Sequence, residues 1–430
     1  MKGKTLAVVG VSVAALALVC GLPVLTGQLG KAQSESRVKA IIAENHIPST
    51  VAELYPKPSG PDELNAFMLM SRLQEAAAKP GMVTVKAPRK GEKWDVDELR
   101  RSVESRHDVL SLSELAASRP TWQAVREGRG PDVKFPDFAA VKTGVKALAE
   151  RARLRSIEGD FKGATADIES AVKLGDLVRS EPILIGGLVS IACHRIAWDV
   201  AADAAGAAKR QDKAALDKLV SVAERSVVND FSRTFLGEAM FSAYVATHPV
   251  DWRDYSSASD TAKPEEVLKA AKYEFDRPYW GPKVVEAWAG FLKAARANPA
   301  DFDTAEQGLA QMNTLAQGRD SRLEVLQILF PVFEQAILAY RGETASHELL
   351  VIGLRAIRDG GLPQVAGSHD PLGKGEYKVA QTDTGWKVYS IGVDRSDDRG
   401  TVSRGGFNGQ DAKNDIVFEW DGKNASLKGR

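Results

Sequence analysis

The sequence predicts a mainly α-helical protein in three parts: an N-terminal transmembrane helix, a body of α-helical hairpins that is tetratricopeptide-like in part, and a small C-terminal antiparallel β module. Three patterns support this fold class. They are an uncharged apolar run near the N-terminus, apolar residues at helical spacing through the middle of the chain, and alternating residues after Pro363. We expect four segments: a membrane anchor over 1–30, juxtamembrane helices with a linker over 31–130, a helical body over 131–361 and the β module over 362–430.

The composition is that of a globular protein with more than one core. The chain has 430 residues, of which 44% are hydrophobic and 27% are charged, and this length exceeds what one ordinary core holds. Lysine and arginine together number 57, as do aspartate and glutamate. Because nucleic-acid-binding proteins usually carry a basic excess, we expect no nucleic-acid partner.

Residues 5–26 carry no charge and predict the anchor. A helix of this length covers about 30 Å, the thickness of the hydrocarbon core of a bilayer. Lys2 and Lys4 precede the run, so we expect a single-pass protein of the cell membrane with its N-terminus in the cytoplasm and the bulk of the chain extracytoplasmic. Two alternatives stay open, a cleaved signal peptide and a lipoprotein modified at Cys20. Because Cys20 lies in this run and Cys193 far beyond it, we expect no disulfide.

The juxtamembrane segment is predicted to hold short helices joined by a linker. Apolar spacing indicates one helix over 34–45 and another that Asp62 caps and that continues to about residue 77. Residues 79–93 are basic and rich in turn formers, with a short strand expected at 82–85. Further short helices are expected over 94–129.

The strongest helical pattern opens the body of the chain. An apolar stripe recurs every three or four residues, passes a tight turn at Gly159 and Asp160, and resumes on a second helix over 161–174. The first part of the stripe consists of Val141, Val145, Leu148 and Ala152. This pair of helices resembles one tetratricopeptide unit, but three units at a fixed period do not follow. We therefore expect helical hairpins.

The remainder of the body is predicted to be helical with one long loop. Pro182 opens an apolar helix that is too short for a second membrane span and is expected to be buried. Asp212 is the expected cap of the next helix. Residues 249–282 are aromatic and rich in loop formers. Later helices are expected over three ranges, the last of them kinked at Pro331: 283–298, 302–316 and 319–358.

After Pro363 the pattern changes to that of a β module. Residues 375–381 and 386–391 alternate on either side of a turn at 382–385, which predicts a β-hairpin. Residues 415–420 form a third strand candidate. Between the second and third strands lies a loop rich in carboxylates, and these are the candidate metal ligands: Asp394, Asp397, Asp398, Asp411 and Asp415.

Clustered carboxylates and turn carbonyls are suited to calcium, which takes about six to eight oxygen ligands. Their spacing is not that of an EF-hand. The same loop also carries four cations, so a salt-bridged loop without metal is the alternative; the cations are Arg395, Arg399, Arg404 and Lys413. Both interpretations stay open, with calcium as the expected cofactor if the site holds one.

Residues 345–420 resemble the C-terminal part of the major pseudopilin of type II secretion systems. The resemblance is carried by Asp370-Pro371, by Tyr389-Ser390-x-Gly392-x-Asp394 and by Asp415-Ile416. It implies a helix followed by a short antiparallel sheet with a calcium-binding loop, in which Asp394 and Asp415 occupy the positions of calcium ligands. The leader and Phe-Thr-Leu-x-Glu helix of pseudopilins are missing here, so the resemblance implies the β module and does not imply assembly into a pseudopilus.

The catalytic candidates are sparse. His347-Glu348 begins like a zincin helix, but Val351 stands where the second histidine belongs. Cys193 and His194 are neighbours on a predicted helix and project from different faces. Glu238 stands in an apolar helix, where it is either a carboxyl with a raised pKa or the ion-pair partner of Arg225 or Arg233.

The expected function is that of a membrane-anchored extracytoplasmic binding or scaffolding protein with a protein partner in the envelope. The helical body also resembles uncharacterised membrane-anchored bacterial proteins through Asn65-Ala66, Gly159-Asp160 and Ala164. Two alternatives remain: a divergent envelope hydrolase near Glu238 or the aromatic segment from Trp252 to Trp280, and a component of a secretion or pilus-like machine.

Overall fold

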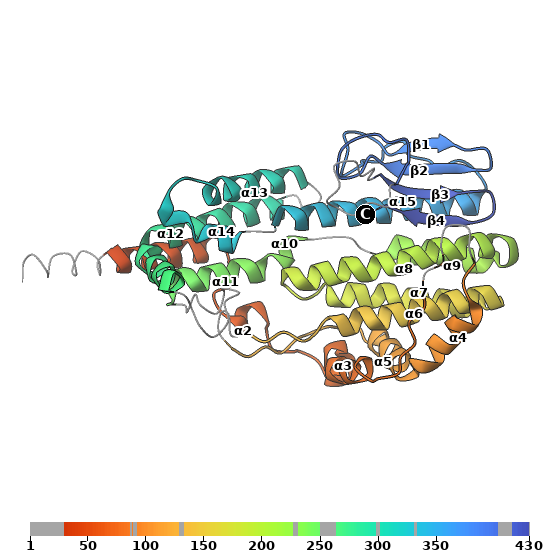
Figure 1. Cartoon of the computed structure of the whole chain (residues 1–430), viewed down its shortest axis with the longest axis horizontal. Coiled ribbons are helices and arrows are strands. Elements are labelled where there is room, and N and C mark those ends of the chain that lie inside the picture. Colours follow the sequence, from red (N-terminus) through yellow and green to blue (C-terminus); the bar gives the residue numbers. More distant parts are fainter. Residues whose placement is uncertain are drawn as a thin grey trace, which may run out of the picture.

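The computed structural model describes most of the chain beyond the predicted anchor; the described residues are 30–86, 88, 93–128, 133–226, 231–249, 264–297, 302–330, 333–402 and 415–429. Residues 5–26 lie outside this part. The fold is mainly helical, with one small antiparallel sheet at the C-terminal end. Figure 1 shows an elongated molecule in which the sheet lies over one end of α15 (Phe333–Asp359).

The N-terminal part is a chain of short helices. A helix spans 30–44, and it is followed by four short elements: α2 (Val51–Leu54), η1 (Asp62–Leu64), η2 (Ala66–Leu69) and α3 (Met70–Ala77). The single helix predicted over 62–77 is therefore wrong at its start. The side chain of Asn65 accepts hydrogen bonds from the backbone N–H groups of Phe67 and Gln123, and its amide donates to the Gln123 carbonyl. These bonds tie the backbone to a distant segment and break the helix at that residue.

The expected strand over 82–85 is also wrong, because side chains of α4 (Val96–Ser105) take its hydrogen bonds. The Val83 N–H donates to Ser105 Oγ at 3.1 Å, and the Val83 carbonyl accepts from Ser102 and Arg106. No partner strand is needed to satisfy this backbone. The next helix along the chain is α5 (His107–Ser118).

The helical hairpin predicted around Gly159 is confirmed. It consists of α6 (Ala139–Glu158) and α7 (Phe161–Val178). The Asp160 side chain caps α7 by accepting a hydrogen bond from the Gly163 N–H at 2.9 Å.

The apolar helix after Pro182 is α8 (Leu184–Gln211), the central helix of the body. It packs against α6, α7 and α15 and against two further elements, α9 (Lys213–Arg225) and β4 (Ala425–Lys428). Within the described residues it is the one helix long and apolar enough to cross a membrane, and half of that apolar window is buried in the protein. The prediction of a buried central helix is confirmed in part, because α8 is central and half of its apolar window is buried. The expectation that the segment is too short to span a membrane is wrong, since the helix has 28 residues. The capping of α9 by Asp212 is confirmed.

The second half of the body departs from the prediction in two places, within 249–282 and at the start of the helix expected over 319–358. Its elements are α10 (Phe231–Thr234), α11 (Leu236–Thr247), α12 (Pro264–Ala297), α13 (Phe302–Ala316), η5 (Ser321–Leu323) and α14 (Leu326–Leu329). The expected loop over 249–282 is wrong from residue 264 onward, since α12 continues through Pro278 and Pro282. Burial of Tyr273, Trp280 and Trp288 on this helix offsets the backbone hydrogen bonds that the two prolines remove. Trp252 and Tyr255 lie outside the described part.

The single long helix expected over 319–358 is wrong at its start, because the chain forms η5 and α14 first and α15 begins at Phe333. The predicted kink residue, Pro331, lies outside the described residues. The helix stop expected after Arg358 is confirmed, since α15 ends at Asp359.

The predicted hairpin is confirmed as β1 (Lys378–Gln381) and β2 (Trp386–Ser390), and the third strand as β3 (Ile416–Trp420). β4 was not predicted. The four strands are antiparallel in the order β1-β2-β3-β4, with Val388 opposite Phe418. The sheet packs on α15 at Gly353, where a Cβ would lie 2.3 Å from the Phe418 ring, so only glycine permits this approach.

Two hydrophobic cores share α8 and α15. The first core holds α6, α7, α8, the C-terminal half of α15 and the sheet. The second holds α10 to α13 and the N-terminal half of α15, including Phe333 and Tyr340. Figure 1 shows α15 extending from the α12–α13 end of the molecule to the sheet. Polar residues gather where the two cores meet, around Glu343 on α15.

Candidate functional site

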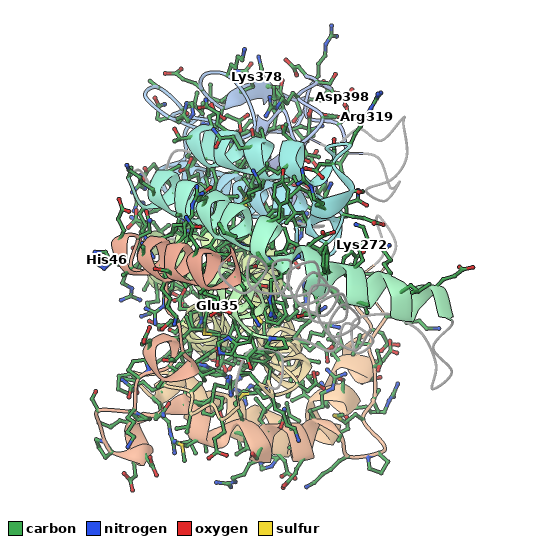
Figure 2. All side chains as sticks on the ribbon, turned by 90° about the vertical axis from the view of Figure 1, so that its left-hand side faces the viewer. Glu35, His46, Lys272, Arg319, Lys378 and Asp398 are labelled. Atoms are coloured by element: carbon green, nitrogen blue, oxygen red, sulfur yellow. The ribbon has the colours of Figure 1, made fainter. Side chains whose placement is uncertain are left out.

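The predicted metal-binding loop follows β2, and the structure brings part of it together. Asp394 is exposed and accepts a hydrogen bond from the Ser396 N–H within its own turn. Asp397 accepts from the Tyr389 hydroxyl and contacts Lys378 Nζ at 3.3 Å. Figure 2 shows Lys378 and Asp398 at the end of the molecule that carries the sheet. Asp394 and Asp397 thus take different hydrogen bonds, and the carboxylates that act on the pKa of Asp415 are those of Asp397 and Asp398.

The buried member of the predicted ligand set is Asp415. Its side chain is inaccessible to solvent, Oδ2 accepts a hydrogen bond from the Gly400 N–H at 2.8 Å, and Oδ1 has no hydrogen-bond partner among the residues that the structure describes. Burial raises the pKa of Asp415 to about 6, and the nearby carboxylates of Asp398 and Asp397 add to the shift. Asp411 lies outside the described residues. Among those that are described, no group of three or more metal-ligating side chains is assembled.

The enzyme-like motifs are occupied by structural contacts. His347 Nε2 lies 2.7 Å from the Ala223 carbonyl, and the Glu348 carboxylate accepts a hydrogen bond from Tyr377. Cys193 is fully buried, and burial raises the pKa of its thiol to about 12, so it is a poor nucleophile. His194 contacts two carboxylates and no thiol.

Glu238 has a structural role at a helix end. Its Oε1 accepts a hydrogen bond at 3.2 Å from the N–H of Leu184, the first residue of α8, where the helix dipole favours an anion. Burial raises the pKa of Glu238. The expected ion pair with Arg225 is wrong, because Arg225 instead bonds Glu169 at 2.7 Å. Glu238 is the one carboxyl in a small apolar pocket, so converging carboxylates are not found around it.

A buried ionic network lies where the two cores meet. Glu343 on α15 accepts hydrogen bonds from Arg179, which follows α7, and from His194 on α8 at 2.8 Å. The second nitrogen of His194 lies 3.0 Å from Asp176. Arg179 also donates to Ser190 on α8. Three helices are therefore joined by charged side chains inside the protein.

The network favours the cationic form of His194. Burial alone would lower the pKa of His194, but its hydrogen bonds to Asp176 and Glu343 raise it above the usual value. Burial would raise the pKa of Glu343, yet the charges of Arg179 and His194 lower it. Both shifts describe one imidazolium–carboxylate pair. The Cβ of any residue replacing Gly175 would lie 2.5 Å from the His194 ring, so glycine at this position of α7 makes room for it.

A groove opens beside this network. It has a volume of about 540 Å³, within the usual size range of ligand sites. Its walls come from α6, α8 and α15, and its lining includes Trp198, Ile191, Ile196, Ala339, Glu343 and Ser346. Val393, from the loop after β2, completes the lining. The site is therefore built from four parts of the chain that are far apart in sequence.

The groove continues into a second hollow of about 660 Å³, since Lys146, Ile196 and Asp199 line both. From Lys142 in the first to Arg153 in the second, the lining follows α6 for about 16 Å at the helical rise. The two hollows together form an open channel between helices, and we call this channel the α6–α8 groove.

The α6–α8 groove carries an unmatched positive charge. Lys142 and Lys146 are exposed, stand one helical turn apart, and have no ion-pair partner among the residues that the structure describes. The cations near Asp199 are Arg195 and Arg153, which lower its pKa. Burial has the larger effect and raises the pKa of Asp199 to about 6. The carboxylate of Glu343 is paired with Arg179 and His194. The two lysines therefore set the sign of the groove's potential.

The sequence predicted none of these groove residues as functional. Lys142 and Lys146 do carry a signal, because two lysines one turn apart border the apolar stripe of a helix. Trp198 and Glu343 carry no local signal in the sequence. From the sequence, Trp198 resembles an ordinary core residue and Glu343 an ordinary surface charge. Their place in the groove follows only from the packing of α8 against α15.

No known protein family matches this chain, and no significant match is found among curated proteins or solved structures. The chemistry of the groove residues is therefore the basis for a functional proposal.

Proposed function

We propose that this protein is a membrane-anchored, extracytoplasmic binding protein that docks a protein partner of the envelope on its helical body. The observation that carries the proposal is the α6–α8 groove, an open channel lined by apolar side chains and two unmatched lysines, Lys142 and Lys146. The uncharged run at 5–26 supports the anchor and, with the lysines before it, the orientation. Concave sites between helices are common ligand sites.

Site-specific photo-crosslinking in intact cells tests the proposal. A photoreactive p-benzoylphenylalanine at Ile196, which lines both hollows, is expected to give a discrete crosslinked protein band on irradiation. The matched control places the same residue at Lys162, which is exposed on α7 and lines neither hollow. A band at Lys162 alone, or at neither position, would contradict docking in the groove.

We further propose that the loop after β2 binds calcium, with Asp397, Asp398 and Asp415 as its nearest carboxylates. The proposal is supported by the buried Oδ1 of Asp415, which has no hydrogen-bond partner among the described residues, and by the resemblance of the β module to pseudopilins. A cation at this oxygen would offset the cost of burying it. Because Val393 precedes the same loop and lines the groove, calcium would also fix part of the groove wall.

Calcium at 1 mM is expected to raise the melting temperature of the full chain, and magnesium to raise it less. The increase should be larger at pH 7.5 than at pH 5, because calcium binds the ionised carboxylate and burial raises the pKa of Asp415 to about 6. The D415N variant keeps an acceptor for Gly400 and should lose the increase, whereas D383N, in the exposed β1–β2 turn, should retain it. Equal increases with D415N and wild type would refute the assignment.

A further inference from the structure

Four buried polar atoms on the lining of the α6–α8 groove have no hydrogen-bond partner among the described residues: Asp199 Oδ1, Arg106 Nε and one atom each of Trp198 and Glu343, the two that concern the ligand. The indole N–H of Trp198 is a donor without an acceptor, and Oε2 of Glu343 is an acceptor without a donor. Both residues are at least nine-tenths buried, and both line the groove. A buried polar group without a partner is costly, so a ligand that offers both an acceptor and a donor would gain free energy at this place.

A peptide backbone offers that combination. Every residue of an extended peptide except proline presents one carbonyl and one N–H. The groove follows α6 for about 16 Å, which is the length of about five extended residues. A compact metabolite would leave most of this channel unfilled. The shape and the two unpartnered atoms therefore both favour a peptide segment.

The charge of the groove selects the kind of peptide. Lys142 and Lys146 have no ion-pair partner within the described part of the chain, whereas Asp199 and Glu343 already face cations. Apolar residues of α8, such as Ile191 and Ile196, line the same groove. The groove thus offers both positive and apolar contacts.

We propose that the α6–α8 groove binds an extended, acidic and apolar segment of the partner protein, an inference that rests on the proposed function. Carboxylates of the segment pair with Lys142 and Lys146, its apolar side chains cover Ile191 and Ile196, and its backbone bonds the indole of Trp198. Complementary charge gives the encounter its selectivity, and the buried contacts hold the segment.

The test uses the full chain in phosphatidylcholine nanodiscs and three fluorescein-labelled hexapeptides measured by anisotropy. The sequences are ELEFEL, its basic counterpart KLKFKL, and EGEGEG, which keeps the charge without the apolar residues. ELEFEL is expected to bind at least about tenfold more tightly than either other peptide, and its affinity should fall as sodium chloride rises. Equal binding of ELEFEL and KLKFKL would overturn the proposal.

Charge reversal provides the matched control. K142E/K146E should lose about tenfold in affinity for ELEFEL and gain affinity for KLKFKL, whereas K162E/K173E, with both changes on exposed α7 positions outside the groove, should behave as wild type. W198F keeps the ring and removes the N–H, so it should weaken ELEFEL severalfold without changing the charge preference. An unchanged affinity in K142E/K146E would refute the assignment of these lysines.

The two proposals fail in different ways. Crosslinking from Ile196 reports any docked protein, whatever its charge. A crosslinked partner together with no preference for ELEFEL would overturn the acidic segment and leave the binding function standing. The absence of a crosslink together with selective binding of ELEFEL would overturn docking in cells while the peptide chemistry held.

Discussion

At the scale of single residues, Glu343 is the charge on which the interior of the protein depends. It is fully buried and is paired with Arg179, which follows α7, and with His194 on α8. Such a pair adds little net stability relative to an apolar one, but removing one partner leaves a buried charge unmatched. Glu343 is therefore important mainly because Arg179 and His194 are buried beside it and would lose their counter-charge if it were replaced.

The E343Q variant should lose about 3 kcal/mol of unfolding free energy, because the glutamine keeps the shape and leaves Arg179 without its counter-charge. The control is E169Q, since Glu169 pairs with Arg225 at the surface, where an ion pair contributes about 1 kcal/mol or less. Denaturant titration of both variants measures the difference. Similar losses of unfolding free energy in the two variants would show that the buried network contributes no more to stability than a surface ion pair.

The pH dependence of stability follows from His194. Its folded pKa is raised by Asp176 and Glu343, so its contribution is fully present below the unfolded value of about 6.5 and is lost as the pH rises through the folded value. Arg179 and His347 also face the group, and neither supplies a negative charge. The stability advantage of wild type over H194Q should therefore be larger at pH 6 than at pH 9, as measured by thermal melts. An advantage that grew with pH would contradict a protonated His194.

At the scale of elements, the contact between α15 and the sheet depends on one glycine. G353A should destabilise the protein by about 1–3 kcal/mol, because the new methyl group meets the Phe418 ring and one of the two elements must move. G342A is the control on the same helix, where the nearest atom lies 3.8 Å away. That change should be neutral or stabilise by up to about 1 kcal/mol, since alanine is the better helix former. Chemical denaturation compares the two, and a stable G353A would mean that the sheet is loosely held.

Local sequence signals predicted those elements whose ends are fixed by neighbouring residues. The α6–α7 hairpin follows from its apolar stripe and the Asp160 cap, and β1–β2 from alternation and a turn. The helix break at Asn65 and the passage of α12 through Pro278 could not be predicted, because bonds to Gln123 decide the first and burial of the aromatic residues of α12 against the rest of the protein decides the second. Long-range contacts outweighed local propensity in both places.

At the scale of the whole molecule, two cores behave as one because they share helices. Trp288 of the second core packs on Phe333 at the start of α15, with ring centroids 5.0 Å apart, and Phe418 of the first core packs on the same helix at Gly353. The groove depends on the same arrangement, since its walls are Lys142 and Lys146 of α6 and distant residues of α8 and α15. That is why the site could not be predicted from sequence, whereas the hairpin could.

Shared helices predict cooperative unfolding. W288A and F418A should each cost about 3–5 kcal/mol, and each should shift a single calorimetric transition without splitting it. The reason is that losing either core leaves α15 without half of its packing. A separate early transition in one variant would show that the cores unfold independently.

The position of α15 in the chain also affects the order of events during synthesis. Residues before 333 leave the ribosome without the helix that closes either core, so neither core is complete until α15 follows. If the chain is exported as proposed, this delay keeps it loosely folded while it crosses the membrane, and the last helix of the body then fixes both cores at once. Nascent chains arrested before and after residue 359 should therefore differ sharply in protease resistance.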